Sequence, residues 1–358
     1  MVSVLASSRA LQRLSVMCVI LACLVSCAGL SNHGALRDAS PPAAPPVTPE
    51  PPEASGAIAW LGADVVFATR GECESLLGTS DPYTQAHSAM DRGVRMKTLE
   101  PTTEGDFLGF AASSCLDWTA EERADWGDAA RRVAAAIDGL TLVTAPTVHL
   151  IKTSGVEEFG AAYTRGGGKI VLPRAYVARG SNLGNPRART SLLAHELWHL
   201  VSRVSPAIHD SAYAIVGFQR VDGVTYPEGL EPGRLTNPDA FTLNHALEVQ
   251  AQSGAFHGVP ILQMKGSLEG LLALDGGQLF SKLSIELLDV DPATGALQRP
   301  TSVPASETNY RELTSLNTHY NIHPEEVVAE NFAALVTRRA PDLVVKVANP
   351  AILDALEA

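Results

Sequence analysis

Short runs of apolar and β-branched residues predict strands in the first half of the chain. Residues 58–69 are rich in Ala, Val and Ile, and residues 147–152 alternate between β-branched and other side chains. A glycine-rich stretch at 166–168 predicts a tight turn before a further strand at 169–172, which Pro173 ends. Because successive side chains of a strand point to opposite faces of a sheet, this alternation indicates strands with a buried face.

Capping signals predict helices around these strands. Residues 81–97 are expected to form one helix. Thr119 and Glu122 form a capping box, in which each side chain satisfies a free backbone amide of the first turn. The helix that follows continues through three consecutive alanines and is expected to end before Gly139.

Two further helices are predicted in the second half of the chain. One contains the sequence His-Glu-Leu-Trp-His at 195–199, with Thr190 or Ser191 as its N-cap. The other begins at Pro324 and continues to about Arg339. Proline suits the first helical position, and the acidic residues that follow it and the basic residues at the end match the helix dipole.

Between these two helices, residues 205–318 predict an insertion with β content. Turn residues at 291–295 separate two segments that predict a hairpin. The predicted strands and hairpin arms of this stretch are 247–251, 260–264, 283–287 and 296–298. The whole pattern predicts an α+β fold with a mixed sheet and a β-rich insertion.

The N-terminal sequence predicts export. Two arginines precede an apolar run at 14–25, which is short for a membrane span and typical of a signal peptide. The sequence Leu-Val-Ser-Cys at 24–27 resembles the lipobox of bacterial lipoproteins. That resemblance implies a signal peptide at 1–26 and a lipid on Cys27. Because Ala28 is not Asp, it also implies the outer membrane if the source is Gram-negative; an ordinary signal peptide is the alternative.

A proline-rich stretch at 27–56 predicts an extended tether that holds the folded part away from the membrane. We expect residues 57–118 to pack on a catalytic domain at 119–345. Residues 346–358 are expected to form a C-terminal tail.

Composition and charge narrow the possible functions. Of 358 residues, 46% are hydrophobic and 18% are charged, which is typical of a globular protein. A net charge of −12 lacks the basic footprint of a nucleic-acid binder. With the signal removed and Cys27 lipidated, Cys73 and Cys115 remain, and export favours a disulfide between them. Two buried free thiols are the alternative.

The motif at 195–199 places two imidazoles on one face of a helix. Residues four apart have β-carbons about 5–6 Å from each other, so His195 and His199 can bind one zinc ion through nitrogen. Glu196 lies beside them and can take a proton from a water that the metal activates. A buried helix whose histidines are satisfied by hydrogen bonds is the alternative.

A catalytic zinc site needs a third protein ligand. Residues 200–205 lack the Gly and His of the metzincin extension, so a glutamate from a later helix is the remaining common option. Glu326 and Glu330 are four apart, on one face of the predicted helix and beside apolar neighbours. Either glutamate can be the ligand, and His323 is a further candidate.

The motif helix together with Glu-x-x-Ala-Glu-x-Phe at 326–332 resembles gluzincin metallopeptidases, including the anthrax lethal factor type of catalytic domain. The resemblance implies a zincin-like fold, with Glu326 as zinc ligand and Glu330 as the carboxylate that orients a ligand histidine. It also implies an oxyanion-stabilising tyrosine, for which Tyr320 is the better candidate and Tyr310 the weaker. It covers two short segments, and the stretch between them is much longer than in thermolysin.

These features predict a zinc-dependent metallopeptidase, lipid-anchored outside the cytoplasm, with one zinc ion and a peptide or protein substrate. No nucleic-acid partner is expected. A non-catalytic lipid-anchored binding protein that retains a zincin fold is the alternative from another class. A zinc hydrolase of cell-wall peptide cross-links is a third possibility.

Two further expectations concern the surroundings of the site. In zincins the strand before the active helix often pairs with peptide substrate, and residues 169–172 are a candidate for that role. The remaining histidines are expected to have no part in the chemistry, although His245 could line a cleft. These histidines are His149, His209, His245, His257 and His319.

Overall fold

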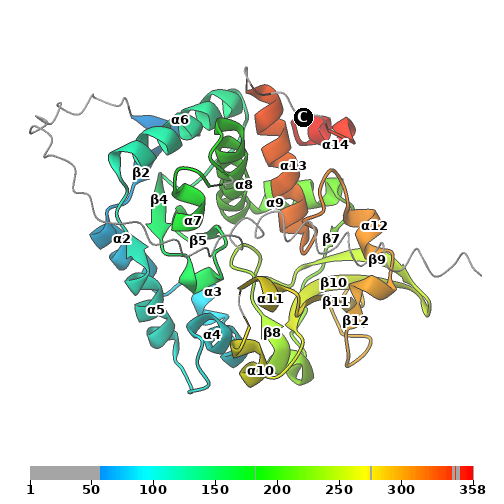
Figure 1. Ribbon diagram of the computed structural model, residues 1–358. Helices are drawn as coiled ribbons and strands as arrows, with labels where there is room; N and C mark the ends of the chain where they lie inside the picture. The colour runs from blue at the N-terminus through cyan, green and yellow to red at the C-terminus, as the bar shows by residue number, and fades with distance from the viewer. Residues whose placement is uncertain (1–56, 182, 275, 341–342, 344–346, 358) are drawn as a thin grey trace, which may run out of the picture.

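The computed structural model describes residues 57–357 except 182, 275, 341–342 and 344–346. The predicted signal peptide, Cys27 and the tether lie outside the described residues. In the described part of the chain, no helix combines the length and apolar character needed to cross a bilayer. This part is an α+β fold with two sheets and a group of long helices (Figure 1).

The first sheet is mixed, with the order β1–β2–β4–β6–β5 and β3 paired to β4. Its strands are β1 Ile58–Trp60, β2 Ala63–Phe67, β3 Cys115–Leu116, β4 Thr147–Thr153, β5 Tyr163–Arg165 and β6 Lys169–Pro173. Neighbours among β2, β4 and β6 are parallel, whereas β1 and β5 are antiparallel edge strands. The single strand predicted at 58–69 is two strands, because Leu61 and Gly62 have φ values of 53° and 84° and turn the chain back.

The glycine-rich turn joins β5 to β6, as the sequence predicts. Gly168 has a φ of 76°, and a Cβ there would lie 2.1 Å from the carbonyl oxygen of Thr147, so only glycine fits. The expected pairing of substrate with residues 169–172 is wrong. Strand β6 already has β4 on one side and β5 on the other, which leaves it no free edge.

Small helices cover one end of this sheet: α2 Arg70–Leu77, α3 Pro82–Gln85, α4 Ala89–Met96 and α5 Glu104–Ser113. The helix predicted at 81–97 is therefore two helices. The Ser88 hydroxyl accepts a hydrogen bond from the Asp91 amide and starts a new helix within the predicted one. The predicted disulfide is confirmed, since Cys73 on α2 is bonded to Cys115 on β3, with a Cα–Cα distance of 5.9 Å.

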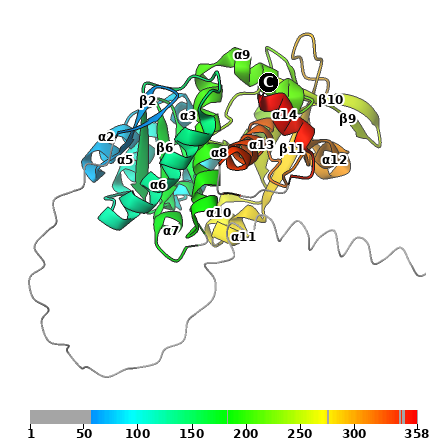
Figure 2. The same cartoon turned by 90° about the horizontal axis from the view of Figure 1, so that it is seen from above.

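Three long helices pack side by side: α6 Ala120–Ile137, α8 Pro186–Val204 and α13 Pro324–Arg339 (Figures 1 and 2). The capping box of Thr119 and Glu122 starts α6, as predicted. Helix α8 begins earlier than its predicted caps, because the Asn185 side chain accepts a hydrogen bond from the Ala188 amide. Between α8 and α13 the rings of Trp198 and Phe332 pack at 5.6 Å, which holds the two helices together.

The predicted insertion forms helix α9, Pro206–Ile215, and an antiparallel sheet of order β12–β11–β10–β9–β7, with β8 paired to β10. Its strands are β7 Gln219–Arg220, β8 Arg234–Leu235, β9 His245–Ala251, β10 Gly254–Met264, β11 Leu283–Val290 and β12 Val303–Pro304. The arm predicted at 296–298 forms only an isolated bridge, between Leu297 and Val290.

The remaining short helices are α7 Arg174–Val177, α10 Leu268–Leu272, α11 Gly276–Phe280, α12 Tyr310–Thr314 and α14 Pro350–Glu357, with 3-10 turns η2 Val156–Glu158, η3 Glu228–Gly233 and η4 Ala305–Glu307. The expected C-terminal tail contains α14, which packs against α13 through the fully buried Leu353. Segment 57–118 contributes β1, β2 and β3 directly to the first sheet.

Candidate metal centre

Helices α8 and α13 bring the three predicted ligands together. His195 and His199 lie one turn apart on α8, and Glu326 lies in the first turn of α13. One donor atom from each of the three lies within 4.8 Å of the other two. All three side chains are buried, because α8 is packed between α6 and α13. The helix pair thus forms a three-donor cluster, called the α8–α13 cluster below.

Within this cluster both imidazoles present the same ring nitrogen to one carboxylate oxygen. Nε2 of His195 lies 3.2 Å from Oε2 of Glu326, and Nε2 of His199 lies 3.6 Å from the same atom. The other oxygen of Glu326, Oε1, accepts a hydrogen bond of 2.8 Å from Nδ2 of Asn237. Asn237 therefore fixes the carboxylate with one oxygen turned toward the histidines.

The opposite ring nitrogens each face a second carboxylate. Nδ1 of His195 lies 3.0 Å from Oε1 of Glu330, and Nδ1 of His199 lies 2.9 Å from Oε1 of Glu325. Nδ1 of His199 is hydrogen-bonded to Glu325, whereas the contact of His195 with Glu330 lacks hydrogen-bond geometry. Both carboxylates lie behind rings whose Nε2 atoms face Glu326, as carboxylates that orient metal-binding imidazoles do. Glu330 stands where the resemblance puts an orienting carboxylate, and it is not where the two Nε2 atoms converge.

Glu325 is held more firmly than Glu330. The Ser202 hydroxyl donates to its Oε1 at 2.5 Å, and the Tyr213 hydroxyl donates to its Oε2 at 2.7 Å. The Glu325 side chain is 2% exposed, whereas that of Glu330 is 42% exposed. The carboxylate that faces His199 thus lies in the core, whereas the carboxylate that faces His195 lies at the surface.

Acidic side chains outnumber the imidazoles around the cluster, as is expected at a site that binds a cation. Four largely buried carboxylates, Glu196, Asp239, Glu325 and Glu326, surround two imidazoles. Burial alone would lower the pKa of His199, but the carboxylates of Asp239 and Glu326 raise it to about 9. Nε2 of His199 is buried and has no hydrogen-bond partner among the described residues. With that pKa the ring carries a second proton near neutral pH, and a metal ion bound at Nε2 would replace this proton both as partner and as positive charge.

Glu196 lies beside the ligands without being one of the three. It is buried, and its Oε2 atom has no hydrogen-bond partner in the described part of the chain. Desolvation, followed by the negative charge of Asp239, raises the pKa of Glu196 to about 8. It is therefore a carboxyl group with one oxygen free of hydrogen bonds next to the converging donors, and a cation bound at those donors would favour its ionised form.

Asp239 belongs to an overlapping donor group with Glu196 and His199. Its Oδ1 atom already accepts hydrogen bonds from Thr164, at 2.8 Å from the amide and 2.5 Å from the hydroxyl. This group contains only one of the two histidines, whereas Oε2 of Glu326 lies near the Nε2 atoms of both. This difference makes Glu326 the better third ligand.

The two tyrosine candidates lie in different surroundings. The Tyr320 ring is 6.3 Å from that of His195 between centroids, and the residue is 40% exposed. Desolvation, then the charges of Glu326 and Asp239, raise the pKa of the Tyr320 phenol well above 10, which keeps it protonated beside the cluster. Tyr310 is buried against Phe218 in the core, at 6.3 Å between ring centroids.

His323, the remaining ligand candidate, caps α13 instead. Its Nδ1 atom accepts a hydrogen bond of 3.1 Å from the Glu325 amide. That bond uses the lone pair that a metal would need, and His323 is not part of the α8–α13 cluster.

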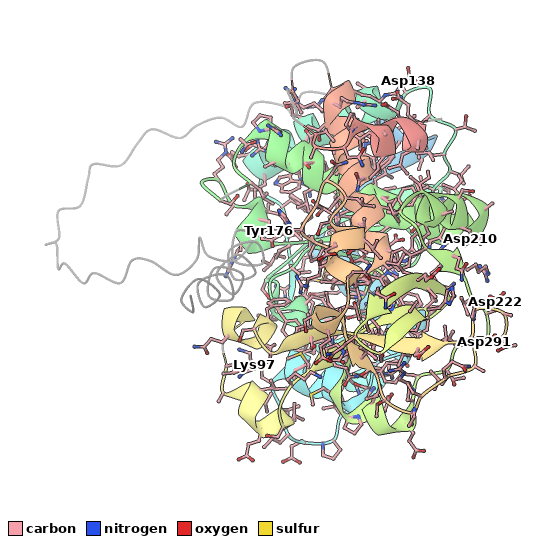
Figure 3. The ribbon with its side chains drawn as sticks, turned by 90° about the vertical axis from the view of Figure 1, so that its right-hand side faces the viewer. Lys97, Asp138, Tyr176, Asp210, Asp222 and Asp291 are labelled. Carbon is pink, nitrogen blue, oxygen red and sulfur yellow. A yellow bond between two sulfur atoms is a disulfide. The ribbon has the colours of Figure 1, made fainter. Side chains whose placement is uncertain are left out.

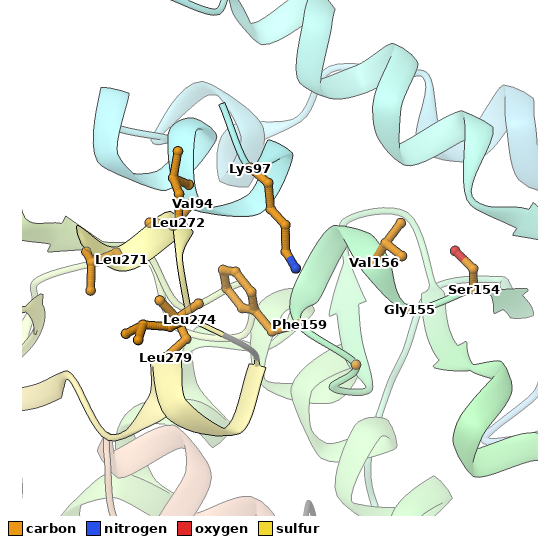
Figure 4. A pocket seen from close by; sticks show the side chains of 11 residues that line it. Val94, Lys97, Ser154, Gly155, Val156, Phe159, Leu271, Leu272, Leu274 and Leu279 are labelled. Atoms are coloured by element: carbon orange, nitrogen blue, oxygen red, sulfur yellow. The ribbon is translucent and has the colours of Figure 1, made fainter. Parts of the chain in front are cut away.

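Two hollows lie near the surface. One of about 270 Å³ opens beside Glu330 and is lined partly by Arg187 and Asn317, so it is polar and adjoins the cluster. The other, of about 250 Å³, is lined by leucines of α10 and α11, by Phe159 and by Lys97 (Figure 4). The second hollow shares no residue with the cluster.

Several members of the site were not identified from the sequence: Ser202, Tyr213, Asn237, Asp239 and Glu325. From the sequence, Glu325 was interpreted only as a partner of the helix dipole. Two consecutive glutamates in one turn beside apolar residues were a signal that both could belong to the site. Asn237 and Asp239 lie in the predicted insertion, where no motif links them to the site.

Comparison of the chain with protein-family models, with curated proteins and with solved structures gives no match.

Proposed function

We propose that this chain is a zinc-dependent metallopeptidase with a zincin-like, gluzincin-type active site on α8 and α13. The observation that supports it best is the convergence of two Nε2 atoms and one carboxylate oxygen beside the uncommitted carboxylate of Glu196. Two imidazoles and a carboxylate are the ligand set of many catalytic zinc sites, which keep one position open. Because Glu196 stands next to the ligands, hydrolysis is better supported than non-catalytic binding.

His195, His199 and Glu326 would hold the ion, with Glu325 and Glu330 orienting the two imidazoles. When bound, zinc supplies the Lewis acidity that lets water attack a peptide carbonyl near neutral pH. The protein provides a dry, preorganised setting for this chemistry, since both imidazoles and Glu196 are buried.

Glu196 is the proton carrier of the proposed reaction. It takes a proton from the attacking water as the oxygen bonds to the carbonyl carbon, and it passes that proton to the amine nitrogen as the C–N bond breaks. Tyr320 can donate its phenolic proton in a hydrogen bond to the oxyanion of the tetrahedral intermediate. Its partly exposed position beside His195 leaves room for substrate.

The proposed location is outside the cytoplasm, on a lipid attached to Cys27. The disulfide between Cys73 and Cys115 fits an oxidising compartment. A peptide or protein is the proposed substrate, reached from a membrane surface through the proline-rich tether.

Substitution of Glu196 by Gln tests the proposal. It keeps the shape of the side chain and removes its capacity to accept a proton. We expect zinc at the α8–α13 cluster to be retained, and kcat against a peptide library to fall by roughly 10²- to 10⁴-fold. Metal analysis and cleavage of the library, followed by mass spectrometry, measure the two quantities.

Glu248→Gln, at an exposed position of β9, is the matched control and should cleave at the wild-type rate. Cleavage by Glu196→Gln at the wild-type rate would show that Glu196 is not the proton carrier. A chain that loses no zinc when His199 is replaced by Ala would contradict the proposed metal site.

A further inference from the structure

A second group of metal-binding side chains lies between α9 and β9. One donor atom from each of His209, Asp210 and His245 lies within 4.8 Å of the other two. His209 and Asp210 come from α9, and His245 is the first residue of β9. From the sequence neither histidine was expected to take part in the chemistry, although His245 could line a cleft, because they are 36 positions apart and no motif joins them.

One oxygen of Asp210 faces both rings of this group. Oδ1 lies 3.1 Å from Nδ1 of His209 and 3.1 Å from Nε2 of His245. The Arg220 guanidinium approaches the other oxygen, Oδ2, at 3.2 Å. Arg220 therefore positions the carboxylate and leaves Oδ1 to the histidines.

The tautomer of His245 makes this contact unfavourable without a cation. Nδ1 lies 2.9 Å from Oδ1 of Asn244, which also accepts from the Thr242 hydroxyl, so Nδ1 carries the ring proton. Nε2 then has a bare lone pair directed at a carboxylate oxygen. The His245 side chain is 1% exposed, and Nε2 has no hydrogen-bond partner in the described residues. A buried ring nitrogen whose lone pair faces a half-exposed carboxylate oxygen, with no proton between the two, favours a cation at that place.

The orientation of His209 supports the same conclusion. Its Nε2 atom faces Oε2 of Glu325 at 3.8 Å, which leaves Nδ1 as the atom turned toward Asp210. The other oxygen of Glu325 contacts His199 of the α8–α13 cluster at 2.9 Å. Glu325 is thus hydrogen-bonded to the imidazole of His199 and lies near that of His209, beyond hydrogen-bond distance, so its negative charge acts on both groups.

We propose that His209, Asp210 and His245 form a second zinc site, joined to the first through Glu325. Two imidazoles and one carboxylate suit zinc, whereas Mg²⁺ and Ca²⁺ prefer an all-oxygen set. Asp210 lies at the edge of the molecule, so the ion can enter from solvent (Figure 3). The proposal does not depend on peptidase activity.

Zinc stoichiometry of the chain tests this site without an activity assay. The full chain, purified in detergent without a histidine tag and stripped with a chelator, is titrated with ZnCl₂ by calorimetry, and bound metal is counted after dialysis. We expect two equivalents for the wild type and one for Asp210→Asn. Magnesium in tenfold excess should displace neither.

Asp222→Asn is the matched control, because Asp222 contacts the same arginine, 2.9 Å from Arg220, but belongs to none of the donor groups. It should bind two equivalents. His199→Ala should bind one, which separates the two sites. His209→Gln, at a partly exposed position, serves as a second variant if Asp210→Asn fails to fold by circular dichroism.

One equivalent in the wild type, with the same value in Asp210→Asn, would overturn the second site and leave the first intact. Two equivalents in both Asp210→Asn and His209→Gln would place the extra ion elsewhere and also overturn it. A wild-type value that His199→Ala does not lower contradicts the proposed function instead.

Discussion

The α8–α13 cluster and the group between α9 and β9 present the same kinds of ligand in different surroundings. Each offers two imidazoles and one carboxylate. The first has both imidazoles backed by carboxylates and has Glu196 beside its donors, with Tyr320 at its edge. The second has Arg220 on its carboxylate and opens to solvent at Asp210. The two groups therefore differ less in their ligands than in what stands beside them, which is a buried carboxyl group at the first and an arginine and solvent at the second.

The largest change in zinc affinity is expected when Glu325, the carboxylate that lies near both groups, is replaced. Glu325→Gln keeps its size but weakens its attraction for the imidazole protons. Because Glu325 stands behind His199 and His209, we expect zinc affinity to fall by roughly 10- to 100-fold at both sites. Calorimetric titration of the stripped chain measures both affinities.

Glu248→Gln, the same change at an exposed position of β9, is the control and should leave both affinities unaltered. A loss confined to the α8–α13 cluster would show that His209 does not depend on Glu325.

His87 is a buried histidine that, unlike those of the two donor groups, has no carboxylate at its ring. Its effect on stability at different pH values therefore shows what burial alone does to an imidazole. Both ring nitrogens lack hydrogen-bond partners in the described residues, and the ring packs edge-on against Tyr83 and Phe107. Desolvation, then the charge of Arg95, lowers the pKa of His87 to about 3. The unfolded chain binds this proton near pH 6.5, so stability is lost as pH falls below that value.

We expect the His87 contribution to cost about 2 kcal/mol of unfolding free energy between pH 7 and pH 5. Urea unfolding of the wild type and of His87→Phe at the two pH values measures it, with the exposed His319→Gln as control. The His87→Phe chain should lose less stability over this range. Equal losses in all three chains would remove His87 as the cause.

The smallest effect is expected from Glu330→Gln. Glu330 faces His195 as Glu325 faces His199, but its side chain is 42% exposed, so water can replace it. Zinc affinity of the α8–α13 cluster should fall by less than roughly tenfold, against the 10- to 100-fold expected for a buried partner. If Glu330→Gln weakened binding as much as Glu325→Gln, burial would not be what distinguishes the two carboxylates.

Elements with strong local signals were predicted well. The capping box of Thr119 and Glu122 starts α6, and Pro324 starts α13, because these signals act within one helical turn. The predicted element boundaries that were wrong depend on single residues that start a turn or a new helix inside a longer predicted element. Gly62 divides one expected strand into two, and Ser88 divides one expected helix.

The strands predicted at 247–251, 260–264 and 283–287 are confirmed, since they lie within β9, β10 and β11, but how the insertion pairs and packs could not be predicted. Its strands pair over long separations, as when β8 joins β10, and its helix α9 has no capping side chain. The same holds for the contacts of Asn237 and Asp239, which reach the site from a loop far from α8 in sequence.

The sequence by itself determined the donors on α8, because residues four apart on a helix must share a face whatever surrounds them. It also limited the third ligand to a later helix. Only the tertiary structure favours Glu326 over Glu330 as the proposed ligand, since that choice depends on which carboxylate meets the two Nε2 atoms when α13 packs on α8. It alone joined His209 to His245, because their proximity comes from the packing of α9 against β9 and not from any local pattern.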